Sequence, residues 1–148
     1  MSLTSFPAKL VARAIAKLDV ENLVGVPGEF SSPVLHALAK LEKPPSCSMS
    51  VNEKVAVGEG IGMAVSGESA IVILGAWGAV KGLPTLASIG RVRLKAPLLI
   101  LSLERGLPDD SRLLAKNLDL PVVEVPTLED VECLLRCSLL ASEAFSLP

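Results

Sequence analysis

Short apolar runs bounded by turn residues alternate along the chain with longer segments whose apolar residues recur at helical spacing. Apolar runs of this length are typical of strands that are buried on both faces of a parallel sheet. We therefore expect strands over residues 22–26, 70–74, 97–102 and 121–125, and a strand of small residues over 46–50. The run Ala70–Leu74 is wholly apolar, which predicts a central position in the sheet.

The segments between these strands carry apolar residues three or four positions apart, which predicts helices that bury one face. Helices commonly begin after side chains that can accept hydrogen bonds from free backbone N–H groups. The expected caps are Thr4 or Ser5, Ser31 or Ser32, Asn52, one of residues 109–111, and Thr127. Gly67 and Gly90 are expected to end two of the helices. Gly58, Gly60 and Gly62 lie inside the helix after Asn52, where we expect them to allow the close approach of another helix.

Strands and helices that alternate through short loops indicate right-handed βαβ units. We therefore expect an α/β fold with three layers, in which helices flank a doubly wound, mostly parallel sheet. The sequence has no internal repeat and no long linker, so residues 1–148 are expected to form one domain. Ligands bind such sheets at the carboxyl ends of the strands.

Composition narrows the class of protein. Half of the residues are hydrophobic but only 3% are aromatic, which favours an aliphatic sheet under helices over an aromatic-rich β-sandwich. The net charge of −2 and the lack of a basic cluster argue against nucleic acid as a partner. No apolar run reaches the roughly 20 residues that span a bilayer, and no signal-peptide core follows the N-terminus. We therefore expect a cytoplasmic protein without a membrane partner.

The sequence contains no complete catalytic set of a familiar kind. His36 is the only histidine, and the phosphate-loop and dinucleotide-binding glycine patterns are absent. Cys47, Cys133 and Cys137 have no His or further Cys nearby that would complete a metal site. We expect these cysteines to be small, buried hydrophobic side chains.

Loops that follow the expected strands supply the polar and aromatic side chains at the predicted ligand edge. They are Glu29, Ser31, Ser32, Asn52, Glu53, Trp77, Lys81, Glu104 and Arg105. Glu53 has two interpretations, because it follows a strand and also begins a helix. A first-turn acid stabilises a helix through its dipole, by roughly 0.3–1 kcal/mol. An acid at the ligand edge, beside the short polar side chain of Asn52, can instead contact a ligand.

Four segments, taken in order, resemble thiamine-diphosphate-dependent decarboxylases. They are the turn Gly25-Val26-Pro27 before a helix, Asn52-Glu53 before a small-residue helix, Leu83-Pro84-Thr85-Leu86-Ala87-Ser88, and Glu104-Arg105-Gly106 after an apolar strand. The similarity covers roughly residues 10 to 140. It is greatest to the pyrimidine-binding (PYR) domain, as in the alpha subunit of sulfopyruvate and phosphonopyruvate decarboxylases.

This resemblance implies the thiamine-diphosphate-binding fold of the PYR type and gives Glu53 the catalytic role. In that family a glutamate contacts N1′ of the aminopyrimidine ring and favours the tautomer that can accept the C2 proton. The implied cofactor-binding residues are Asn52, Glu53, Gly75, Ala76 and Trp77. Arg105 would meet the anionic tail of the substrate, a small sulfopyruvate-like 2-oxo acid that loses carbon dioxide.

The family also uses a pyrophosphate-binding (PP) domain, whose Gly-Asp-Gly motif is absent from this sequence. The resemblance therefore implies a separate PP-domain subunit that shares the thiamine diphosphate and alone supplies the Mg²⁺ ligands. It also implies a homodimer, which would form through the helices after Asn52 and after Gly78.

Some residues depart from the family pattern. The loop from Gly75 to Val80 is apolar where related enzymes carry polar residues, and Trp77 stands where glycine is common. Lys54 replaces the small or acidic residue that usually follows the glutamate. These departures leave open a second hypothesis, a degenerate, non-catalytic PYR-like module for assembly or regulation. A third hypothesis is an unrelated flavodoxin-like binder, in which Glu53 only begins a helix.

Overall fold

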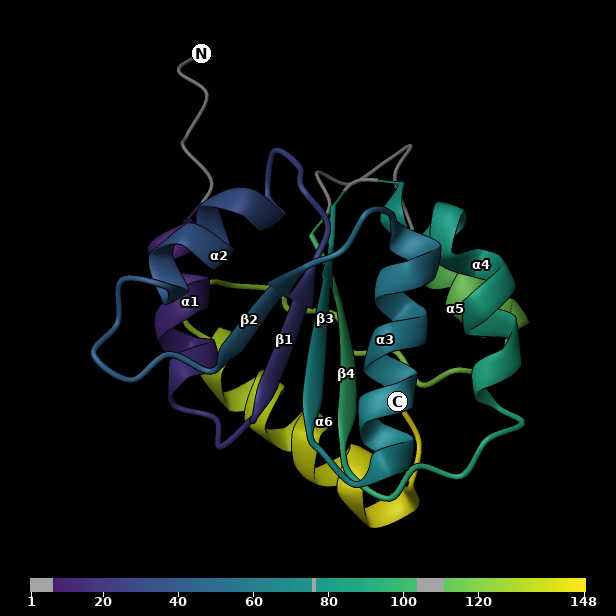
Figure 1. Cartoon of the computed structure of the whole chain (residues 1–148). Coiled ribbons are helices and arrows are strands. Elements are labelled where there is room, and N and C mark those ends of the chain that lie inside the picture. The colour runs from purple at the N-terminus through teal and green to yellow at the C-terminus, as the bar shows by residue number, and fades with distance from the viewer. Residues whose placement is uncertain (1–6, 76, 104–110) are drawn as a thin grey trace.

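The structure is a computed structural model that describes residues 7–75, 77–103 and 111–148 (Figure 1). Helices and strands alternate through the first two thirds of the chain, and two helices follow. The strands are β1 (Asn22–Gly25), β2 (Ser46–Met49), β3 (Ala70–Leu74) and β4 (Leu98–Ser102). The helices are α1 (Ala8–Ala16), α2 (Ser31–Leu38), α3 (Glu53–Ser66), α4 (Gly78–Ile89), α5 (Arg112–Asn117) and α6 (Val131–Phe145).

All pairings of the described strands are parallel, in the order β2-β1-β3-β4. The interior position of β3 confirms the prediction from its wholly apolar sequence, and each of its residues is buried. Gly25 pairs with Met49 and with Ile73, and Leu74 pairs with Ser102. The carboxyl ends of the strands therefore lie at one edge of the sheet, as the predicted α/β fold requires.

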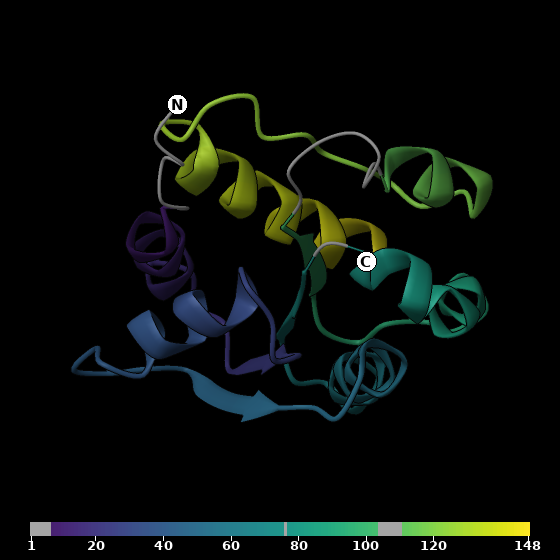
Figure 2. The same ribbon diagram turned by 90° about the horizontal axis from the view of Figure 1, so that it is seen from above.

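Helices cover both faces of this sheet, which gives the three predicted layers (Figure 2). Successive residues of a strand point to opposite faces. Ile71 and Ile73 pack in the cluster that contains the buried residues of α1, α2 and α6. Val72 and Leu74 pack in the cluster that contains those of α3 and α4. The alternation within one short strand thus sorts the helices into two layers.

One glycine of α3 lets this helix lie directly on the sheet. A Cβ atom at Gly60 would collide with the Val72 side chain and lie 3.2 Å from Leu98 Cδ1. The expectation that the α3 glycines allow helix–helix contact is therefore wrong for Gly60, which permits helix–sheet contact. A Cβ at Gly58 would make only an ordinary contact with Thr85 of α4, at 3.9 Å, and one at Gly62 would meet nothing within 4 Å.

The predicted strand over residues 121–125 is wrong. This segment has no regular secondary structure, and Val122 and Val123 are exposed. Helix α6 forms hydrogen bonds with the first residue of β4, on the edge that does not face β3. The Ser142 hydroxyl accepts from Leu98 N–H at 2.9 Å and donates to Leu98 C=O at 3.1 Å. The segment lies across a cavity of about 750 Å³ from β4, so its backbone does not join the sheet.

Several predicted helix starts are displaced. Phe30 stands at the N-cap of α2, so Ser31 is the first helical residue rather than the cap. Helix α6 begins at Val131, and Thr127 lies in the preceding turn, where its hydroxyl donates to Asp130 at 2.6 Å. The caps predicted at Thr4 or Ser5 lie outside the described residues, and α1 begins at Ala8. No helix of the described ranges combines the length and hydropathy needed to cross a bilayer.

Candidate functional site

The first turn of α3 carries the Asn-Glu pair at the carboxyl edge of the sheet. Asn52 has an extended backbone, and its side-chain oxygen accepts a hydrogen bond from Val55 N–H at 2.9 Å. This bond confirms the predicted N-cap and fixes where the helix begins. Glu53 is consequently the first helical residue, and its side chain starts from a rigid position. Gly67 ends the helix in the left-handed conformation, also as predicted.

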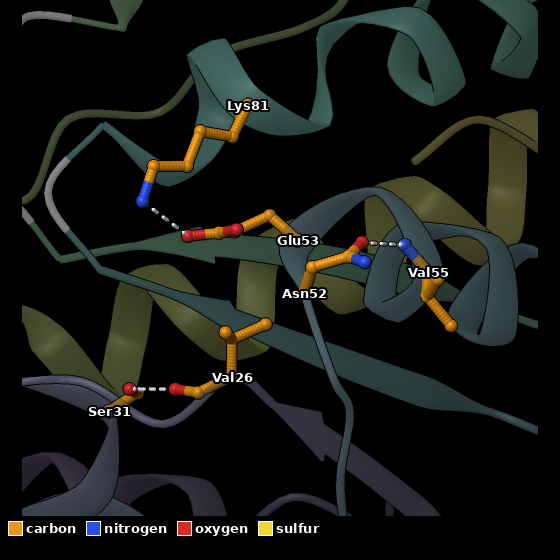
Figure 3. Close-up of polar contacts among 6 residues, drawn as sticks. All are labelled: Val26, Ser31, Asn52, Glu53, Val55 and Lys81. Carbon is orange, nitrogen blue, oxygen red and sulfur yellow. Dashed lines mark hydrogen bonds and ion pairs between the residues drawn. The ribbon is translucent and has the colours of Figure 1, made fainter.

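The Glu53 carboxylate extends from α3 toward α4, away from the Asn52 amide (Figure 3). Its side chain is only 13% exposed, and its Oε1 atom lies 3.2 Å from Lys81 Nζ on α4. A carboxylate this far from water requires a hydrogen-bonding or charged partner. Lys81, which is 62% exposed, supplies that partner in this structure.

Two glycines bring α4 close to Glu53. A Cβ atom at Gly78 would lie 2.6 Å from Leu74 Cβ and 3.6 Å from Glu53 Cγ. A Cβ at Gly82 would lie 3.3 Å from Val57 Cγ2 and 3.7 Å from the Glu53 carbonyl oxygen. The close approach of α3 and α4 therefore depends on glycines of α4, which the sequence analysis did not single out.

The loop between β3 and α4 holds further predicted cofactor contacts. Trp77 is the N-cap of α4, is 50% exposed, and adopts a left-handed backbone with φ of 62°. This conformation is strained for a bulky residue, and such strain is concentrated at functional sites. A Cβ at Gly75 would meet nothing within 4 Å, so the space before this loop is open. Ala76 lies outside the described residues, as do Glu104 and Arg105.

The serines that follow β1 stabilise their own loop rather than face the Asn-Glu pair. The Ser31 hydroxyl donates a short hydrogen bond to the Val26 carbonyl (Figure 3). The Ser32 hydroxyl accepts from Gly28 N–H at 3.0 Å. These contacts hold the turn between β1 and α2, which leaves Glu53 as the central polar group of the edge.

Ser50 is a further polar residue at this edge that sequence reasoning missed. Its backbone N–H donates to the Gly25 carbonyl at 2.8 Å, which continues the β1–β2 pairing by one residue. Its side chain is buried, and the hydroxyl finds no hydrogen-bond partner among the described residues. A buried hydroxyl without a partner is rare in proteins and leaves a group available to a ligand or to water. In the sequence, the only sign that Ser50 belongs to this edge is its position two residues before Asn52.

The other candidate groups lie away from this site. The 750 Å³ cavity is mostly apolar and is lined chiefly by β4, α5, α6 and the segment 121–128; Ala79 and Leu86 of α4 also line it, but Glu53 does not. His36 is an exposed residue of α2. Within the described residues no group of three or more His, Cys, Asp or Glu side chains could hold a metal ion.

The prediction that the cysteines are buried is wrong. Cys47, Cys133 and Cys137 are all free and exposed. Cys133 and Cys137 lie one turn apart on α6, and the negative charge and hydrogen bond of the Cys137 side chain raise the pKa of the Cys133 thiol. Partial burial raises the pKa of the Cys47 thiol on β2.

Comparison with known families identifies the chain independently of this geometry. Residues 7–121 match the family model for the thiamine pyrophosphate enzyme, N-terminal TPP binding domain. A search of curated proteins found no match to the chain. A family match over most of the chain contradicts the hypothesis of an unrelated flavodoxin-like binder. The chain therefore belongs to the family of N-terminal TPP binding domains of thiamine pyrophosphate enzymes.

Proposed function

We propose that this chain is the PYR subunit of a two-subunit thiamine-diphosphate-dependent enzyme that decarboxylates a small, sulfopyruvate-like 2-oxo acid. The observation that supports the proposal most is the position of Glu53. Its carboxylate is mostly buried, begins α3, and lies at the edge where parallel sheets bind ligands. The match to a TPP-binding family model supports thiamine diphosphate as the ligand of this edge.

The residues around Glu53 fit the aminopyrimidine end of the cofactor. A planar ring with an N–H group needs an acceptor, a surface to stack on and open space. Glu53 offers the acceptor, Trp77 an exposed aromatic ring, and Gly75 the open space. The unpaired Ser50 hydroxyl adds a polar group at the same edge.

In this proposal three residues of the chain have defined tasks. Glu53 accepts a hydrogen bond from the ring nitrogen and holds that proton in place. Asn52 fixes the start of α3, and therefore the position from which Glu53 reaches the ring. Arg105 pairs with the anionic tail of the substrate. The bound cofactor supplies the electron sink that allows the 2-oxo acid to lose carbon dioxide.

The diphosphate and its Mg²⁺ require groups from a second chain. The Gly-Asp-Gly motif with which the PP domains of the family serve the metal and the diphosphate is absent from this sequence. We therefore assign both to a PP-domain subunit that shares the cofactor. Exposed Val55 on α3 and Val80 on α4 place apolar surface beside the site, which supports a homodimer through these helices.

Reconstitution tests the proposal. The chain is mixed with a PP-domain partner, thiamine diphosphate and Mg²⁺, and carbon dioxide release is measured from several 2-oxo acids. Glu53→Gln should lower turnover by about 100-fold or more, since it removes an acid–base group. Glu59→Gln, at an exposed position of the same helix, should leave turnover unchanged. The proposal fails if no partner restores turnover or if Glu53→Gln retains it.

A non-catalytic PYR-like module is the second candidate. Lys81 already forms an ion pair with the Glu53 carboxylate that the cofactor needs, which favours this alternative. Such a module would form the complex with its PP partner, as measured by analytical ultracentrifugation. The complex would then show no turnover with any 2-oxo acid, and Glu53→Gln would not alter its assembly.

A further inference from the structure

Lys81 and Glu53 form an ion pair in which the two partners differ greatly in exposure. The ammonium group sits on a side chain that is 62% exposed, whereas the carboxylate side chain is 13% exposed. Losing the pair costs the lysine little, because water can solvate its charge. The same loss leaves Glu53 largely desolvated and without the partner that this structure gives it. The carboxylate thus depends on having some donor at this position.

The backbone places Lys81 over Glu53. Its N–H donates to the Trp77 carbonyl at 3.0 Å, so it lies one turn into α4 from the strained N-cap. Gly78 and Gly82 on either side keep α4 within contact distance of Glu53. The lysine therefore reaches the carboxylate from a fixed helix, as Figure 3 shows.

We propose that Lys81 is a positioning residue that substitutes for the cofactor in the free subunit. Its ammonium donates to the Glu53 oxygen that the aminopyrimidine ring needs, and it withdraws into solvent when the ring binds. This inference rests on the proposed function, because it takes the aminopyrimidine ring as the ligand of Glu53. The free subunit thereby keeps its buried carboxylate paired, and the cofactor must exchange with an internal donor.

An exchange of this kind lowers cofactor affinity by the strength of the ion pair. Exposed and half-exposed pairs are weak, so removing the lysine should tighten binding by about two- to fivefold. A structural role for Lys81 predicts the opposite, since losing the pair would loosen the site.

The single tryptophan of the chain gives a direct measurement, because Trp77 lies in the loop that precedes α4. Thiamine, which carries the aminopyrimidine ring without the diphosphate, is titrated against the full chain while Trp77 fluorescence is followed. Lys81→Met is compared with the wild type and with Lys54→Met, which removes the same charge from an exposed position on α3. In parallel, acetylation of Lys81 by acetic anhydride is measured by mass spectrometry with and without thiamine.

The proposal predicts that Lys81→Met binds thiamine about two- to fivefold more tightly, while Lys54→Met binds as the wild type does. It also predicts that thiamine increases the acetylation of Lys81 in the wild type. Equal or weaker binding by Lys81→Met, or unchanged acetylation in the presence of bound thiamine, overturns this inference and leaves the proposed function standing. If no variant of the free chain binds thiamine, this inference is overturned, because it places the exchange in the free subunit, and reconstitution with the PP partner still decides the proposed function.

Discussion

Two residues that flank the candidate site have backbone conformations that determine where its side chains point. Asn52 is extended and caps α3, which directs Glu53 toward α4. Trp77 is left-handed at the start of α4, a conformation that costs a non-glycine residue about 1–3 kcal/mol. The direction of the Glu53 side chain and the backbone strain at Trp77 do not follow from residue type. Both depend on how the loops before α3 and α4 are arranged in the folded chain.

Cys133 provides a test at the scale of single thiols. Its pKa is raised above the ordinary value, first of all by Cys137, so its reactive thiolate is scarce near neutral pH. Cys137→Ala removes both the charge and the hydrogen bond of this side chain and should return the pKa of Cys133 toward the ordinary value. The rate at which iodoacetamide alkylates Cys133 at about pH 8 should therefore rise, and the difference from wild type should disappear at higher pH. Equal rates for the two proteins at pH 8 would contradict this assignment.

Between elements, the contact of α3 with the sheet allows a matched pair of substitutions. Gly60→Ala forces a methyl group into Val72 and should destabilise the protein by about 1–3 kcal/mol. Gly62→Ala on the same helix meets open space and should stabilise by up to about 1 kcal/mol, because alanine favours helix. Urea denaturation of both variants measures the free energies of unfolding. If both variants lost a similar amount of unfolding free energy, the contact of Gly60 with the sheet would not be the cause.

The junction between α6 and β4 depends on one hydroxyl. Ser142 bonds both backbone groups of Leu98, and Ser142→Ala would leave them buried without this partner. We expect a loss of about 1–3 kcal/mol in the free energy of unfolding. Ser138→Ala, one turn earlier on α6, serves as the control and should change stability by less than about 0.5 kcal/mol. Thermal unfolding followed by circular dichroism measures both, and a stable Ser142→Ala would contradict the role of this contact.

At the scale of the whole molecule, the alternation of apolar runs and helical periods predicted the sheet well. The strands predicted over residues 22–26, 46–50, 70–74 and 97–102 are present, with slightly shorter bounds. Patterning and burial agree best in β3, where every residue is buried, whereas every residue of β2 is exposed. The segment 121–125 has equally apolar residues, but a strand needs a backbone to pair with, and α6 bonds the start of the available edge. Pairing of this kind depends on the whole fold and cannot be deduced from a short run.

The local geometry at the centre of the candidate site was predictable from the sequence, whereas the contacts around it were not. Asn52 and Glu53 were identified because cap chemistry and position after a strand are local signals. The contact between Glu53 and Lys81 joins two helices, and the unpaired Ser50 hydroxyl depends on burial by neighbours. Cys133 and Cys137 were misjudged because composition cannot tell which face of α6 meets the core, and Cys47 was misjudged because every residue of β2 is exposed.

The strand order also constrains how the chain is made. β1 lies between β2 and β3, and Asn22 pairs with Ala70 across roughly fifty residues of sequence. During synthesis, β1 therefore leaves the ribosome roughly fifty residues before β3, its second neighbour. Contacts this distant in sequence form slowly, and an apolar strand that waits for its partner is open to aggregation. Production of this protein should consequently depend on chaperone supply more than its small size suggests.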